Sequence, residues 1–147
     1  MRPDPAHAIW LAQPDERLRT QLAAGLRNDG MHVVEYVSPE AALEALREGG
    51  KAAVLVTTPA EGRLTNRELA EQARLAAPRI ELILTPSAPR PEGTPTAGFH
   101  VLSRPLDSFR LSRFIRLVAA KPSLRGVLQA QYRSARSDDL ASVPVAS

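Results

Sequence analysis

Residues 32–57 read His-Val-Val-Glu-Tyr-Val, then Ser-Pro-Glu-Ala-Ala-Leu-Glu-Ala-Leu-Arg-Glu-Gly-Gly, then Lys-Ala-Ala-Val-Leu-Val-Thr. The apolar runs at 32–37 and 52–57 are continuous, which is typical of strands covered on both faces. Between them, Ser38 can cap a helix that the glycines at 49–50 end. A strand, a helix and a second strand in this order predict a parallel β-α-β unit.

The same alternation extends through most of the chain. Three further apolar runs, at 8–12, 80–84 and 99–103, predict strands. Three further helices are predicted: one with Leu18, Leu22 and Leu26 on its inner face, one opened by the capping-box pair Thr65 and Glu68, and one opened by Asp107. Right-handed crossovers between these units predict an α/β fold, a three-layer, doubly wound parallel sheet of five strands.

The chain departs from this alternation in its second half. Residues 86–95 contain four prolines, which deny a helix its amide donors, so we expect the fourth helix to be shortened or lost. We divide the chain into an N-terminal extension (1–6), one domain (7–120), an amphipathic C-terminal helix (121–136) and a flexible tail (137–147).

Four segments carry a resemblance to a known family. They are Pro-Asp-Glu-Arg-Leu-Arg at 14–19, Gly-Met-His-Val-Val-Glu at 30–35, Leu-Thr at 84–85 and Ser-Arg-Pro-Leu-Asp at 103–107. In this order and spacing, the chain resembles a response-regulator receiver domain. The resemblance implies the flavodoxin-like or CheY-like strand order 2-1-3-4-5.

The resemblance also shows what this chain lacks. Working receivers hold magnesium with an acidic pair, phosphorylate an aspartate, and use a hydroxyl and a lysine beside it. In the alignment that the resemblance implies, the acidic pair corresponds to Gln13 and Pro14, and the aspartate corresponds to Thr57. The hydroxyl corresponds to Thr85 and the lysine to Arg104. An amide and a proline ring supply none of the charge that magnesium prefers, and a threonine cannot form an acyl phosphate. We therefore expect a degenerate pseudo-receiver with no catalytic residue, no metal site and no cofactor.

Two alternatives concern charged or metal-binding side chains. A local shift of the alignment would bring Asp15 and Glu16 to the metal position, although the acceptor carboxylate would still be missing. The histidines His7, His32 and His100 lie on or beside three different strands, without the spacing of a metal site. We interpret them as strand-edge residues with no acidic partner.

Composition and charge narrow the classes of partner. No apolar run reaches the ~20 residues that cross a bilayer, no signal peptide is evident, and the chain has no cysteine, so we expect a cytoplasmic protein without membrane contact. Residues 1–103 carry 11 basic and 13 acidic side chains, whereas residues 104–147 carry 8 and 3. A basic C-terminal third can attract an acidic protein surface or nucleic acid.

We expect the chain to act by contact, not as an enzyme. The hypothesis is a phosphorylation-independent regulatory protein–protein interaction module of bacterial signalling or transcription control, with a homodimer as one form. The alternative is a DNA-associated regulator that uses the basic segment 104–136. The expected partner-binding residues are three arginines at helical spacing and the apolar stripe of the C-terminal helix, namely Arg110, Arg113, Arg116, Leu124, Val127, Leu128 and Tyr132.

Overall fold

The computed structural model describes residues 7–60, 64–86, 98–103 and 105–119. Its elements, in chain order, are β1 (Ile9–Ala12), α1 (Glu16–Asn28), β2 (Val33–Tyr36), α2 (Pro39–Arg47), β3 (Val54–Thr57), α3 (Asn66–Ala76), β4 (Glu81–Leu84), β5 (His100–Val101) and α4 (Ser108–Ala119). The chain divides into two compact units, Met1–Phe114, which holds the sheet, and Ile115–Ser147, of which the last part of α4 is described.

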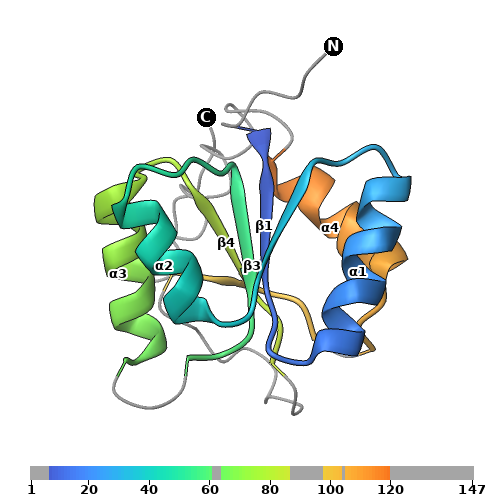
Figure 1. Cartoon of the computed structure of the whole chain (residues 1–147), viewed down its shortest axis with the longest axis horizontal. Helices are drawn as coiled ribbons and strands as arrows, with labels where there is room; N and C mark the ends of the chain where they lie inside the picture. The colour runs from blue at the N-terminus through green and yellow to red at the C-terminus, as the bar shows by residue number, and fades with distance from the viewer. Residues whose placement is uncertain (1–6, 61–63, 87–97, 104, 120–147) are drawn as a thin grey trace, which may run out of the picture. The chain divides into compact units, whose positions relative to one another are not determined.

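The five strands form one parallel sheet in the order β2-β1-β3-β4-β5. Figure 1 shows α2 and α3 on one face of this sheet and α1 on the opposite face. The predicted fold class and strand order are therefore confirmed. Because β1 pairs with β2 on one side and with β3 on the other, consecutive strands are added on opposite sides of β1. The strand order therefore has its topological switch point at β1.

Side-chain caps determine where the helices begin. Asp15 accepts a hydrogen bond from the amide of Leu18 at the start of α1, and Ser38 caps α2 in the same way. Thr65 forms the full capping box with Glu68 at the start of α3, as the sequence predicts. Caps of this kind satisfy amide donors that would otherwise lack an intrahelical partner.

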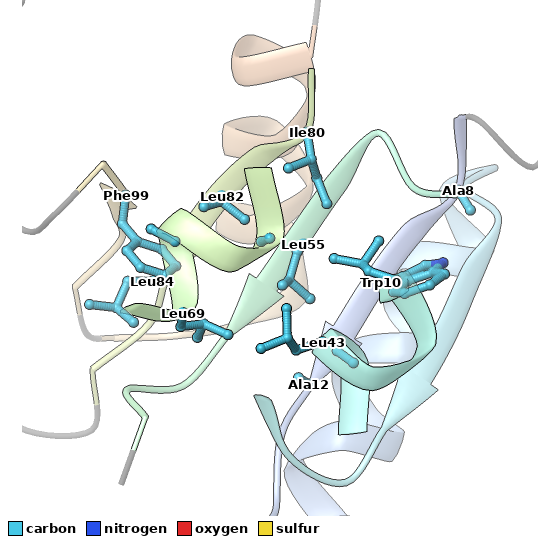
Figure 2. Close-up of a cluster of buried hydrophobic side chains, with 14 residues drawn as sticks. Ala8, Trp10, Ala12, Leu43, Leu55, Leu69, Ile80, Leu82, Leu84 and Phe99 are labelled. Atoms are coloured by element: carbon cyan, nitrogen blue, oxygen red, sulfur yellow. The ribbon is translucent and has the colours of Figure 1, made fainter. Parts of the chain in front are cut away.

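One hydrophobic core lies between the sheet and the α2–α3 layer (Figure 2). Trp10, which the sequence places in the core, is buried there and packs on Tyr36 with ring centroids 4.8 Å apart. The labelled side chains of this cluster are Ala8, Trp10, Ala12, Leu43, Leu55, Leu69, Ile80, Leu82, Leu84 and Phe99. Alternate residues of the same strands point toward the opposite face, where α1 lies.

One strand is shorter than the sequence predicts, and several predicted segments lie outside the described residues. The last strand spans only His100–Val101, whereas the apolar run predicts a strand over 99–103. Within the described ranges the chain has four helices, and none of these is long and apolar enough to cross a membrane. The expected proline-rich loop (beyond Pro86), the C-terminal helix, the tail and the N-terminal extension lie outside the described residues.

Candidate functional site

The polar residues predicted for the degenerate site meet at the carboxyl ends of three neighbouring strands. Ala12 pairs with Thr57, and Thr57 pairs with Leu84 in the sheet register. Gln13 and Thr85 each directly follow one of these partners, so the structure brings Gln13, Thr57 and Thr85 together. Doubly wound folds form their ligand sites at this end of the sheet, beside the strand where the order reverses.

Thr57 and Thr85 are joined by hydrogen bonds and are closed to solvent. Thr57 has an exposed fraction of 0% and Thr85 of 4%. The carbonyl of Thr57 accepts from the Thr85 amide at 2.9 Å and from the Thr85 hydroxyl at 3.3 Å. The Thr57 hydroxyl donates to the Thr58 carbonyl at 3.0 Å. Both hydroxyl protons are therefore used within the backbone of the strand ends.

Gln13 connects the end of β1 to the start of α1. Its side chain is buried, and its Oε1 accepts from the Asp15 amide at 3.0 Å. Its carbonyl accepts from Nη1 of Arg19 at 2.8 Å, while the next residue, Pro14, is exposed. These contacts give the glutamine a structural role in the turn into the helix.

The alternative acidic pair lies at the start of α1. The carboxylate of Asp15 accepts from the Leu18 amide at 3.2 Å as the cap of α1, and Glu16 lies exposed in the first helical turn. A carboxylate in either place stabilises the positive end of the helix dipole.

The side chains at the strand ends offer a metal ion only neutral oxygens. Within residues 7–60, 64–86, 98–103 and 105–119, no three His, Cys, Asp or Glu side chains gather as a metal-binding group. Magnesium binds in proteins through one or two carboxylates together with water or phosphate oxygens. The arrangement of Gln13, Thr57 and Thr85 does not fit that donor set.

The predicted partner-binding arginines of α4 have different surroundings. Arg110 turns back and donates to the carbonyls of Ser103, at 2.9 Å, and Pro105. Arg113 is exposed and lies over the ring of Phe109, and Arg116 is exposed but has an interaction of its own. Arg104 and the apolar stripe Leu124, Val127, Leu128 and Tyr132 lie outside the described residues.

The structure contains a polar pair that the sequence interpretation missed. Glu81, in β4, has an exposed fraction of 4%, and its Oε1 lies 3.1 Å from Nε2 of His100 in β5. The His100 ring also meets the edge of Phe114. The interpretation of His100 as a residue without an acidic partner is therefore wrong. One signal was available, because Glu81 is an acidic residue inside an apolar run.

Comparisons with known proteins agree with this fold. No protein-family model matches the chain, and no curated protein matches it. Several solved receiver domains do match in structure. One is a CheY-like receiver domain protein from Methanospirillum hungatei, with a TM-score of 0.65 and 16% identity over 75% of this chain and 90% of that one.

Two further matches have the same character. A two-component response regulator from Clostridium difficile has a TM-score of 0.67 and 13% identity, covering 78% of this chain and 97% of that one. The receiver domain of a Pseudomonas aeruginosa sensor histidine kinase has a TM-score of 0.66 and 16% identity, covering 79% of this chain and 99% of that one. That domain holds a magnesium ion in its active-site cleft. At these identities the likeness is one of fold.

Proposed function

We propose that this chain is a cytoplasmic pseudo-receiver that regulates a partner protein by contact, without accepting a phosphoryl group and without acting as an enzyme. The likeness to receiver domains supports a signalling module. The residues at the strand ends support the loss of phosphoryl transfer, since they supply no acceptor and no metal-binding carboxylate.

The observation that carries the proposal is the environment of Thr57. This residue ends the central strand with no exposed surface, and its carbonyl accepts both hydrogen bonds from Thr85. In a working receiver an aspartate at this position would have to reach a phosphodonor and a metal ion. A buried threonine whose hydroxyl is donated to the backbone has neither the carboxylate nor the access for that reaction.

Phosphodonor treatment of the full chain tests the loss of chemistry. The protein is incubated with acetyl phosphate and magnesium, and its intact mass is followed, with a functional receiver domain as the positive control. We expect no added phosphoryl group, and no saturable heat of magnesium binding in calorimetry. Incorporation of phosphate that the Thr57→Ala variant abolishes would overturn the proposal.

The contact role has a separate test. The regulatory hypothesis predicts that a native-cell pull-down recovers a protein partner, and that charge reversal of Arg110, Arg113 and Arg116 weakens this recovery. Sedimentation of the wild type beside Leu128→Asp tests the homodimer. Under the alternative, a DNA-associated regulator, a DNA duplex would bind and its affinity would fall steeply with added salt.

A further inference from the structure

The first turns of α4 expose a large aromatic side chain. Phe109 has an exposed fraction of 68%, while the next apolar residue of the helix, Leu111, is fully buried. Phe109 therefore lies on the outer side of α4 and contributes little to the core. An isolated exposed apolar residue needs no explanation, so its neighbours decide what Phe109 means.

A cation is held over this ring. The guanidinium carbon of Arg113, one helical turn further on, lies 5.6 Å from the centroid of Phe109. The contact holds a positive charge directly beside an exposed apolar surface. We call these two residues the Phe109–Arg113 pair.

The arginines of α4 give the pair positively charged neighbours, although the carboxylate of Asp29, the C-cap of α1, also lies against this helix and accepts from the Ser112 hydroxyl. The α4 sequence, Ser-Phe-Arg-Leu-Ser-Arg-Phe-Ile-Arg-Leu-Val-Ala, contains no acidic residue. Asp107, which precedes the helix, uses its carboxylate to accept from the Arg110 amide at 2.8 Å. Arg110 donates to two backbone carbonyls, so part of its guanidinium is already hydrogen-bonded within the chain. Its positive charge still lies near the pair. Arg113 is consequently the arginine of this turn that is open to a partner.

We propose that the Phe109–Arg113 pair is a docking site for an acidic amphipathic segment of a protein partner. An apolar side chain of the segment covers the Phe109 ring, and a carboxylate beside it pairs with Arg113. This inference rests on the proposed function, whose partner it characterises. The charge of Arg113 favours an acidic partner, and the exposed ring beside it favours an apolar anchor, which a phosphate backbone does not supply.

Peptide binding to the full chain tests this assignment. The probes are a synthetic helical peptide with leucine and glutamate on one face, the same peptide with lysine in place of glutamate, and a short DNA duplex. The variants are Phe109→Ala and Arg113→Glu. The control is Arg79→Glu, which makes the same change of charge at an exposed position before β4. Circular dichroism verifies that every variant folds.

We expect the acidic peptide to bind and the lysine peptide to bind at least about fivefold more weakly. Phe109→Ala and Arg113→Glu should each weaken the acidic peptide by a similar factor, and Arg79→Glu should not. The assignment is wrong if the acidic peptide does not bind, if Arg79→Glu weakens it as much as Arg113→Glu, or if the duplex is bound in preference through Arg113. None of these results depends on phosphoryl transfer, so they leave the test of Thr57 chemistry intact.

Discussion

A buried threonine at the carboxyl end of β3 occupies the position that the sequence aligns with the acceptor aspartate of receiver domains. The side chain of Thr57 offers no carboxylate, and its hydroxyl donates to the Thr58 carbonyl. Gln13, which the sequence aligns with a metal-binding carboxylate, has an amide side chain whose oxygen accepts from the Asp15 amide. At both positions the polar atoms stabilise strand ends and a helix start, which are structural tasks.

An aspartate introduced at position 57 should therefore destabilise the protein without restoring phosphorylation. The Thr57→Asp carboxylate would be placed where the exposed fraction is 0%, and a buried charge without a partner costs more than a lost hydrogen bond. In urea denaturation we expect the free energy of unfolding to fall by about 3 kcal/mol or more. The loss should shrink as the pH falls and the carboxylate takes up a proton. Thr57→Val, which removes only the hydroxyl, should cost about 1 kcal/mol.

Gly50 is needed for the space beside Trp10. A Cβ atom at this position would lie 2.5 Å from Cη2 of Trp10 and 2.8 Å from the carbonyl oxygen of Ala45. Overpacking of this kind costs about 1–3 kcal/mol, so Gly50→Ala should lower the free energy of unfolding by that amount. The same substitution in a Trp10→Phe background should cost less, because the indole atoms it meets are gone and only the contact with the Ala45 carbonyl oxygen remains. Equal costs in both backgrounds would contradict the account.

Tyr36 gives the fold a dependence on alkaline pH. Burial raises the pKa of the Tyr36 phenol above its ordinary value of 10.0, so the folded state favours the neutral ring. The resulting contribution to stability is complete below pH 10 and is lost as the pH rises through the folded-state pKa. Stability should fall more steeply with alkaline pH in the wild type than in Tyr36→Phe. Parallel curves for the two proteins would refute this assignment.

At the scale of elements, helix starts and the buried strands were predictable from local sequence. Thr65 and Glu68 form the expected capping box, and Asp107 accepts from the Arg110 amide at the start of α4. Such contacts join residues three apart, so the sequence spacing already contains them. The capping box contributes directly to the stability of α3.

Removing the capping box should therefore have a measurable and non-additive cost. Thr65→Ala should lower the free energy of unfolding by about 1 kcal/mol. Glu68→Ala should add little in the Thr65→Ala background, because the two side chains satisfy each other's backbone amides as one unit. Fully additive losses in a double-mutant cycle would show that the two caps act independently.

Contacts between distant elements were not predictable in the same way. Glu81 and His100 lie 19 residues apart, and only the pairing of β4 with β5 brings them to 3.1 Å. The return of Arg110 to the Ser103 carbonyl likewise depends on the path of the chain before α4. Hydrophobic periodicity reports which face of an element is buried, but it contains no information about such cross-element pairs.

For the molecule as a whole, the sheet has the strand order of receiver domains, and Gln13, Thr57 and Thr85 lie at the carboxyl ends of its strands. The strand order and the core could be predicted because each strand carries its own apolar pattern. The positions of Gln13, Thr57 and Thr85 at neighbouring strand ends also follow from the predicted strand order. The hydrogen bonds that these three side chains form with the surrounding backbone could not be predicted from the sequence, since these bonds depend on the packing of three strand ends.

Backbone amide NMR spectra recorded with and without magnesium and beryllofluoride, a phosphoryl mimic, test the loss of phosphoryl chemistry most directly. We expect the resonances of Gln13, Thr57 and Thr85 not to move, because these residues offer no carboxylate to the metal or the mimic. A functional receiver domain under the same conditions is the positive control. Saturable shifts centred on Gln13, Thr57 and Thr85 would show that the strand ends still bind the metal or the mimic, and the proposed loss of phosphoryl chemistry would be wrong.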